Sequence, residues 1–559
     1  MSKTIKNNII VSATHTKNYM IGDTLIDYLK YHTTVQNNQS SFISFIMNKG
    51  IEFETKIIKY INDNKIPVIS VSDSITDNSI KRTIELMELG TPIIHSAPFK
   101  NNKNNTQGII DILIRSDYLD KLVDECPLIA SEKITGKKKY HYVVIDIKFS
   151  TLYLTSDGRH ILNIKNYKAY KAQLLIYTEA VGEIQGYKSP YAFILGRRWE
   201  YTAKKIKYNS TSCLSKLGVV DYKGVDSFYI EKTKKAIEWV RDVKTNGHNW
   251  ILPTDKTLPS KIELYPNMCN DSLRYQKEKE KIAHDIGDIS CVWYCNEKNR
   301  QLAINKGVYS WKDVGCTSAI MGINGIRAVV IDNILDINRQ AKDKIRPLKI
   351  KTDMFNWRNN YNEVFVDFET LCDIFDPFDN LPYQEYNDQI FMIGIYYKRD
   401  DKLEYRNFTC NKNTREEEHR IMDEFMSFIK LLGNPKIWYW CAETNFWERS
   451  KNRQPMQGDW TLTNCVNLQK IFKTEPIVIK DCFNYGLKSV AMSMKKHGFI
   501  TTDLSSDCKT GMNACVDAWK CYRDEVNPVD SVVMKDIMEY NKFDCKVLYD
   551  ILAYIRNNH

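Results

Sequence analysis

Long apolar runs are missing from this sequence, and no stretch approaches the ~20 consecutive apolar residues that a membrane-spanning helix needs. The first residues, MSKTIKNNII, also lack the apolar core of a secretory signal peptide. We therefore expect a soluble, intracellular protein, cytoplasmic or nuclear, with no membrane partner.

Closely spaced cysteine pairs are scarce as well. The 15 cysteines are scattered along the chain, which fits reduced thiols in an intracellular compartment better than a disulfide framework. The nearest approach to a cluster is Cys291 with Cys295, which together with Cys269 and Cys316 could hold zinc or an iron–sulfur cluster. Dispersed cysteines in a cysteine-rich chain are more often buried apolar residues. The role of these four stays open.

A strong excess of charge of one sign is also absent. The 79 Lys and Arg residues exceed the 69 Asp and Glu residues by +10, which would assist binding to a polyanion without requiring it. A hydrophobic content of 43% is enough to build cores and excludes a mainly disordered chain. At 559 residues the chain is too long for one hydrophobic core, so we expect two or three folded units.

The hydrophobic pattern divides the chain into three parts of an α/β multidomain protein. Residues 1–200 alternate helix-period and strand-period segments, which predicts an α/β unit. Residues 201–355 are mostly helical in pattern and basic at their start, and we interpret them as a connecting domain. Residues 356–559 form a second α/β unit, with a new strand from Val364 and a long terminal helix that ends near Ile555.

Two strands of the first part each carry a carboxylate among apolar residues. In the segment 143–149 the strand period of two places Asp146 and Lys148 on one face and the apolar side chains on the other. Asp111 lies in a similar apolar strand. Burying such a charge is costly unless it is paired. A divalent cation between Asp111 and Asp146 would supply that pairing, activate a water and neutralise charge on a scissile phosphate, while Lys148 orients the water or stabilises the transition state.

Two helices supply further candidates for this site. Glu54 belongs to an apolar stripe with Ile57, Ile58 and Ile61, which makes it a candidate metal ligand. Gln173 and Tyr177 are one turn apart on a later helix and face one site together. For an isolated Asp-x-Lys segment, an ordinary salt bridge at a sheet edge is the commoner interpretation; the complete set favours a site.

The order and spacing of these segments resemble RecB-family nucleases of the PD-(D/E)XK fold over about residues 45–200. The matching segments are Gly50 to Glu54, Gly108 to Asp111, Asp146 to Lys148, Gln173 to Tyr177 and Ala192 to Arg197. The resemblance implies a restriction-endonuclease-like core in which Glu54, Asp111 and Asp146 bind Mg²⁺ or Mn²⁺. It makes Lys148 catalytic and assigns Gln173 and Tyr177 to the DNA-facing side. Some members carry an iron–sulfur cluster on flanking cysteines, but no cysteine precedes Glu54, which argues against one here.

A second set of acidic residues lies near the C-terminus. The strand 364–370 places Asp367 and Glu369 on one face, where two like charges about 7 Å apart invite a cation. In the last helix Tyr540 and Asp544 recur at helical spacing within an apolar stripe, so both should face inward. This combination suits two-metal phosphoryl chemistry with the phenol ordering the attacking water. A solvated sheet face is the simpler alternative for the Asp-x-Glu segment alone.

This half resembles the RNase H-like DEDD exonucleases of the tyrosine type, through Asp367 to Glu369 and Tyr540 to Asp544. The segment Tyr485 to Ser489 is similar to one in predicted nucleases that join a RecB-like half to an RNase H-like half in the same order. The resemblance implies a further metal-binding acid, which we match to Glu448, where related exonucleases carry Asp. It also leaves Asn467 where a carboxylate is common, which would weaken the second site.

Together these patterns predict a metal-dependent nuclease that hydrolyses phosphodiesters, with a RecB-like site and a second 3′–5′ exonuclease-like site. DNA is favoured over RNA as the nucleic acid partner, and a helicase or repair partner is not identified. The alternative is a nucleic-acid-binding scaffold whose C-terminal nuclease fold is inactive. Lys148 argues against that alternative in the first half, because a pure binder does not need a lysine beside a metal-binding acid.

Overall fold

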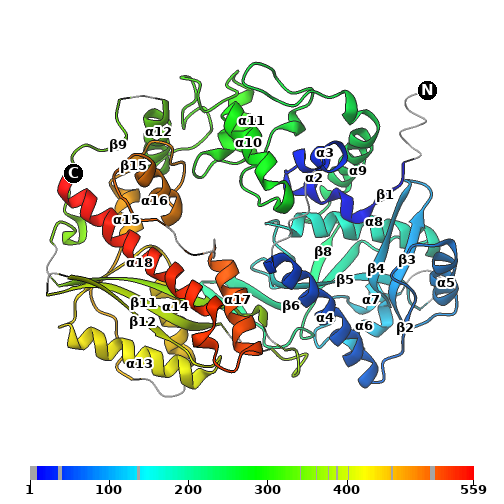
Figure 1. The fold of residues 1–559 in the computed structure, drawn as a ribbon. Coiled ribbons are helices and arrows are strands. Elements are labelled where there is room, and N and C mark those ends of the chain that lie inside the picture. Colours follow the sequence, from blue (N-terminus) through cyan, green and yellow to red (C-terminus); the bar gives the residue numbers. More distant parts are fainter. Residues whose placement is uncertain are drawn as a thin grey trace. The chain divides into compact units, whose positions relative to one another are not determined.

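The computed structural model describes all residues except 1–8, 35–40, 135–138, 340–341, 360–361, 376, 385–387, 401, 455–457, 504–505 and 507–509. The chain divides into two compact units, each built around its own large sheet (Figure 1). The first unit contains Met1–Gln39, Ile43–Ile282 and Asp376–Glu385, and the second contains Ser40–Phe42, Ala283–Phe375 and Tyr386–His559. Each unit is described by itself.

The first unit has an eight-stranded sheet with the order β2-β3-β4-β5-β6-β7, to which β1 adds beside β4 and β8 beside β6. Its strands are β1 (Val11–Ser12), β2 (Val68–Ser70), β3 (Ile93–Asn101), β4 (Thr106–Arg115), β5 (Tyr142–Tyr153), β6 (Tyr191–Ala203), β7 (Ile206–Asn209) and β8 (Gly218–Asp221). Its helices are α2 (Lys17–Ile21), α3 (Leu25–His32), α4 (Ser41–Asp63), α5 (Asp77–Glu88), α6 (Leu119–Leu122), α7 (Ala130–Lys133), α8 (Tyr167–Gln185) and α9 (Tyr229–Asn246), with α10 (Gln276–Ile286) at its boundary.

Strands β3, β4 and β5 form an antiparallel meander, and β6 returns parallel to β5 after α8. Both faces of this sheet are apolar. On one face, Phe53, Ile57 and Ile61 of α4 are fully buried in the same cluster as Ile145 of β5. On the other face, α8 packs with α9 in a second cluster that includes Val144. The alternation of β5 therefore directs Asp146 and Lys148 to the α8 face.

The segment expected to be a helical connector begins differently. Strand β6 continues past residue 200, and β7 and β8 both pair with it, so the start of the segment extends the first sheet. Residues 201–282 belong to the first unit and residues 283–355 to the second. The strands form here because Val219 and Val220 are β-branched and become fully buried against β6.

The second unit has a five-stranded sheet with the order β12-β11-β10-β13-β14 and a two-stranded sheet of β9 and β15. Its strands are β9 (Ile345–Arg346), β10 (Glu363–Leu371), β11 (Gln389–Arg399), β12 (Lys402–Thr409), β13 (Lys436–Tyr439), β14 (Cys465–Asn467) and β15 (Val478–Ile479). Its helices are α11 (Glu297–Ile304), α12 (Ile326–Arg339), α13 (Arg415–Leu431), α14 (Glu443–Arg453), α15 (Leu468–Thr474), α16 (Leu487–Lys496), α17 (Gly511–Asp524) and α18 (Val532–Asn558).

The central strand β10 is antiparallel to β11 and parallel to β13. Helices α13 and α18 cover opposite faces of this sheet (Figure 1). Phe368 of β10 contacts Phe425 of α13, whereas Phe365 contacts Tyr549 of α18. Because residues two apart share a face, Asp367 and Glu369 lie with Phe365 on the α18 side.

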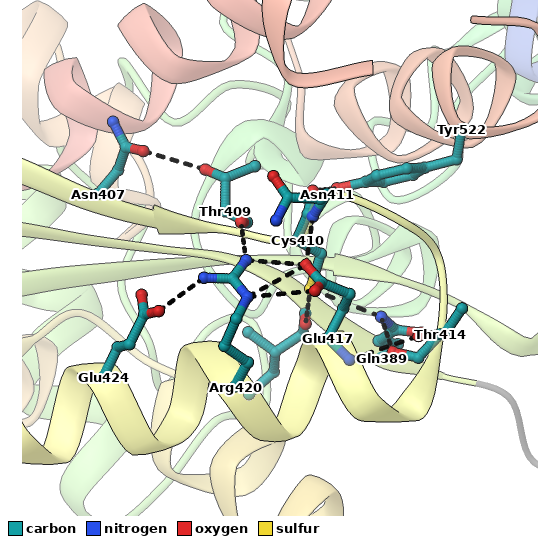
Figure 2. A network of polar contacts seen from close by, with 11 residues as sticks. Gln389, Asn407, Thr409, Cys410, Asn411, Thr414, Glu417, Arg420, Glu424 and Tyr522 are labelled. Carbon is teal, nitrogen blue, oxygen red and sulfur yellow. Dashed lines mark hydrogen bonds and ion pairs between the residues drawn. The ribbon is translucent and has the colours of Figure 1, made fainter. Parts of the chain in front are cut away.

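A polar network holds the start of α13 against the end of β12 (Figure 2). Arg420 donates to both carboxylate oxygens of Glu417, to Glu424 and to the backbone carbonyl of Thr409 at 2.7 Å. Glu417 in turn accepts a 2.6 Å hydrogen bond from the backbone amide of Asn411. Charge-assisted bonds of this kind fix the helix in register with the sheet. No helix in the described part of the chain has both the length and the apolar character that a membrane span requires.

Candidate active sites

The first site is formed where β4 and β5 run side by side. Lys148 Nζ lies 2.8 Å from Asp146 Oδ2 and 3.9 Å from Asp111 Oδ2. The backbone amide of Ile147 donates to Asp111 Oδ2 at 2.8 Å. Ser96, opposite Asp111 on β3, has a left-handed backbone (φ 46°) where the ladder between the two strands is interrupted. The two acids and the lysine expected from the sequence are therefore adjacent.

Helix α8 closes this site with the two side chains expected from its helical spacing. Gln173 Nε2 donates to Asp146 Oδ1 at 3.3 Å and to the Tyr177 hydroxyl at 2.7 Å. The Tyr177 ring lies so close to β4 that a β-carbon on Gly108 would be 2.8 Å from it. The glycine that precedes the acid of this strand thus leaves room for the tyrosine.

Glu54 of α4 hydrogen bonds to His95, and its charge acts on Asp111. Its Oε1 is 3.1 Å from Nε2 of His95 on β3, and the other ring nitrogen of His95 is 2.9 Å from the Ser70 hydroxyl. Sequence reasoning missed His95. No hydrophobic periodicity or motif marks this histidine in the sequence. Only the pairing of β2 with β3 brings Ser70 to it.

The electrostatics of the first site are those of a concentrated negative charge with one cation. Burial, and then the Asp146 carboxylate, raise the pKa of Asp111 well above its ordinary value, and the charge of Glu54 adds to the rise. Burial alone would lower the pKa of Lys148, but the Asp146 and Asp111 carboxylates outweigh it and raise that pKa. Lys148 therefore stays protonated while it bridges the two acids.

The second site is built on β10 and α18. Asn541, fully buried on α18, donates from its amide to Asp367 Oδ2 at 2.9 Å and to Glu369 Oε1 at 3.4 Å. The hydroxyl of Tyr405 on β12 donates to Asn541 Oδ1 at 2.9 Å and fixes the orientation of the amide. One neutral side chain thus holds both strand acids, as sequence reasoning did not foresee.

Tyr540 and Asp544 lie one turn apart on α18 and face the same acids. Both are at least nine-tenths buried, and Tyr540 hydrogen bonds to Asp544, which acts to lower the Asp544 pKa. The ammonium of Lys488, at the start of α16, lies 3.9 Å from the centre of the Tyr540 ring. Its positive charge acts on both Glu369 and Asp544. Lys488 is therefore a cation of the second site that the sequence analysis left without a role.

The structure does not bring Glu448 to this cluster. Glu448 lies on the exposed side of α14, whereas Glu443, the first residue of that helix, is buried. The charge of Glu443 acts on both Asp367 and Asp544. Five residues of α-helix rotate a side chain by about 140°, so the two glutamates cannot share a face. Glu443, rather than Glu448, is therefore the acid of this helix that lies at the cluster.

Burial, together with neighbouring acids for three of them, raises the pKa values of the four acids in the second cluster. Burial comes first in each case: it raises the pKa of Glu369 and that of Asp544 to about 7, and that of Asp367 well above its usual range. Asp367 also feels Glu369, Asp544 and Glu443, while the pKa of Glu443 is raised by its own burial. Such a cluster is stable only when it holds protons or a cation.

The structure also places Asn467 and three of the four cysteines whose role the sequence leaves open. The Asn467 side chain caps α15 by accepting the backbone amide of Lys470 at 3.2 Å, so an amide stands where a carboxylate is common in the resembled family. Cys295 and Cys316 are buried core residues whose thiols both lie near the Met321 sulfur, at 3.7 and 3.9 Å. Cys269 is exposed and lies in the first unit.

Both clusters contain carboxylate oxygens, the ligands that a divalent cation such as Mg²⁺ prefers. In the described part of the chain, no three His, Cys, Asp or Glu side chains are already arranged as a metal site. Lys148 and Asn541 instead occupy carboxylate oxygens that a cation would need. In the second cluster, however, Asp544 Oδ1 is buried and no donor among the described residues reaches it. Oxygen-only ligands, raised pKa values and this buried oxygen fit a hard cation such as Mg²⁺ or Mn²⁺.

Comparison with known proteins bears on the second unit alone. No curated protein and no solved structure matches the chain. Residues 364–556 match a family model described as the RNase H superfamily. This segment begins in β10 and ends in α18, so it contains Asp367, Glu369, Glu443, Tyr540 and Asp544. The match supports an RNase H-like domain in the C-terminal part of this mixed α/β chain, and such a domain suggests a nuclease-like function related to nucleic acid.

Proposed function

We propose that this chain is a divalent-metal-dependent nuclease with two active sites, and that the RNase H-like domain trims nucleic acid from its 3′ end. The observation that carries the proposal is the cluster of half-buried Asp367 with buried Glu369, Glu443 and Asp544, with Tyr540 beside it. Four carboxylic acids gathered in one place have no structural benefit, because their mutual repulsion destabilises the fold. Binding of cations gives the arrangement a purpose.

In the second site, metal ions would be held by Asp367, Glu369, Glu443 and Asp544, and would supply charge neutralisation at the phosphate and an activated water. Tyr540 is placed to order that water, because its phenol sits one turn before Asp544 and bonds to it. Lys488 lies across the Tyr540 ring and brings positive charge to the place where a substrate phosphate would arrive. Asn541 keeps both strand acids oriented before a cation binds.

We propose a second, RecB-like nuclease site at Asp111, Asp146 and Lys148. The order of elements supports it: α4, the antiparallel strands β3, β4 and β5, then α8, then β6 parallel to β5. Lys148 contacts the acid beside it and approaches the acid of the neighbouring strand, so its ammonium can stabilise negative charge at a phosphate between them. Glu54 with His95 would complete the site from the side of α4.

DNA is the substrate that we propose for both sites, on the resemblance of the first half to RecB-family nucleases. The net charge of +10 is compatible with a polyanionic substrate but does not choose between DNA and RNA.

The deciding experiment incubates the purified full-length protein with single- and double-stranded DNA and RNA, labelled at the 5′ end, with Mg²⁺, Mn²⁺ or EDTA. We expect a ladder of shortened 5′-labelled products with Mg²⁺ or Mn²⁺ and intact substrate with EDTA. Undiminished cleavage in EDTA would exclude the metal mechanism. Tight binding without cleavage by any metal would favour the scaffold alternative.

A further inference from the structure

Two cysteine thiols from distant parts of the second unit meet beside the second site. Cys372 directly follows β10, and Cys515 lies on α17, 143 positions later in the chain. Their sulfur atoms are 3.2 Å apart. Cys515 is buried at 4% exposure, whereas Cys372 is half-buried. A pair of thiols this close is a chemical unit rather than two separate apolar residues.

The elements on both sides keep the pair together. Helix α17 packs directly on β10. Just beyond Cys372, Phe375 stacks on Trp519 of α17, with ring centroids 5.1 Å apart and an angle of 15° between the planes. This stacking and the strand–helix packing hold the two segments in place next to the cysteines. The thiol of Cys372 and burial raise the pKa of Cys515, which makes the Cys515 thiol a poor first nucleophile.

We propose that Cys372 and Cys515 are a reversible oxidation site, which a hydroperoxide converts into an intrachain disulfide. A disulfide has a sulfur–sulfur length of about 2.05 Å, so the sulfurs need to approach by roughly 1 Å, which is small enough for side-chain rotation alone.

The chemistry balances with hydrogen peroxide as the oxidant. The more accessible thiol, Cys372, attacks one peroxide oxygen as its thiolate; the O–O bond breaks, and water leaves once a proton is taken up, so that Cys372 becomes a sulfenic acid. The Cys515 sulfur then attacks the Cys372 sulfur, the S–O bond breaks, and a second water leaves. Overall, two thiols and one peroxide give one disulfide and two waters, and a dithiol reductant reverses the reaction.

The crosslink would join two elements of the second site. Cys372 lies three residues after Glu369 on the same stretch of chain, and a β-carbon on Gly511, the first residue of α17, would lie 4.0 Å from the Tyr540 hydroxyl. Oxidation would therefore tie the strand of the acids to the helix that borders the tyrosine. Any effect on end trimming rests on the proposed function, whereas formation of the disulfide does not.

The test treats the full-length protein with hydrogen peroxide, blocks the remaining thiols with an alkylating reagent, and maps peptides by mass spectrometry before and after reduction. We expect a crosslinked peptide pair containing Cys372 and Cys515, which disappears with dithiothreitol. Cys521→Ser, on the same helix, is the matched control and should leave the crosslink unchanged. If the exposed Cys269 and Cys441 react with peroxide while the Cys372–Cys515 pair stays unlinked, the inference is wrong.

Thermal unfolding gives a second readout that needs no nuclease activity. A disulfide that closes a loop of this length restricts the unfolded chain, so the peroxide-treated protein should unfold at a higher temperature than the reduced protein. Cys372→Ser and Cys515→Ser should each remove that increase, and Cys521→Ser should retain it. An equal increase in Cys372→Ser would assign it to another oxidation event and overturn the proposal. An untreated protein without nuclease activity would contradict only the proposed function, not the oxidation site.

Discussion

Gly394 leaves free the space that the Asn541 side chain occupies. A β-carbon at position 394 of β11 would lie 1.7 Å from Asn541 Oδ1, and Gly394 is the residue paired with Asp367 across the two strands. The absence of a side chain at one position therefore allows the amide of the other to reach both strand acids. The arrangement of the acids on β10 therefore requires a residue without a side chain at this position of β11.

Gly394→Ala should damage the second site through Asn541. The new methyl group must displace a fully buried side chain, which we expect to lower the free energy of unfolding by about 1–3 kcal/mol and to reduce 3′-end trimming strongly. Urea unfolding and the end-labelled assay measure the two effects. Gly50→Ala is the matched control, because it sits in α4 with nothing within 4 Å of the new atom. It should be neutral or stabilise by about 0.5–1 kcal/mol. Wild-type trimming by Gly394→Ala would show that the Asn541 contacts are dispensable.

Glu443→Gln and Glu448→Gln separate the two candidate acids of α14. Because only Glu443 is buried near Asp367 and Asp544, its amide variant should lower trimming by roughly 100-fold or more, since even the partners of metal ligands are worth about 10- to 100-fold. Glu448→Gln should retain wild-type rates. The opposite order of effects would restore Glu448 as the ligand.

Each site should be removable without the other, since each has its own acids. Asp146→Asn or Lys148→Ala should abolish one cleavage activity and leave 3′-end trimming, and Asp367→Asn should do the reverse. Both Asp-to-Asn changes keep the size of the side chain, so circular dichroism should be unchanged. If Asp146→Asn leaves all cleavage intact, the first half is not a nuclease.

The stability of the metal-free protein should fall as the pH rises through about 7. In the folded protein Glu369 and Asp544 have pKa values of about 7, well above those of exposed carboxylic acids. The folded state therefore holds protons that the unfolded state has already lost at pH 6, so raising the pH removes stability. We expect a loss of roughly 2 kcal/mol between pH 6 and pH 8 in EDTA. Urea unfolding at both pH values measures it.

Glu369→Gln is the control for this pH dependence, because it cannot lose a proton and should show a smaller loss between the two pH values. Saturating Mg²⁺ should also reduce the loss by favouring the charged carboxylates. A wild-type protein that is equally stable at pH 6 and pH 8 in EDTA would contradict the raised pKa values.

Sequence periodicity predicted the inward-facing residues of long elements well. The two-residue period of β5 and β10 placed Asp146, Lys148, Asp367 and Glu369 on the faces where the structure has them, because one-sided burial fixes a strand's register. The inward face of the terminal helix could be predicted equally well, because buried residues recur along its full length. These elements carry their orientation in their own sequence.

The remaining parts depend on long-range contacts. Helix α14 has only 11 residues and few apolar ones, so its sequence did not indicate that Glu443 rather than Glu448 faces inward. His95 and Lys488 gain a role from partners on other elements, Glu54 and Tyr540. The strands β7 and β8 pair at different positions with the edge of β6 that β5 leaves free. No local pattern encodes such pairings.

The short segment 376–385 has a consequence for dissecting the protein. Although it lies between β10 and β11 in the sequence, it belongs to the first unit. There Phe378 packs on Phe53 and Phe149, and the backbone carbonyl of Pro382 accepts a hydrogen bond from the amide of Cys213. A gene fragment that stops at residue 282 would encode the first unit with Phe53 uncovered, and one that starts at residue 356 would carry a loop without its binding surface. Dividing the chain at a single position would therefore not yield two independently folded proteins. Mutations in the intact chain are the appropriate way to separate the two proposed activities.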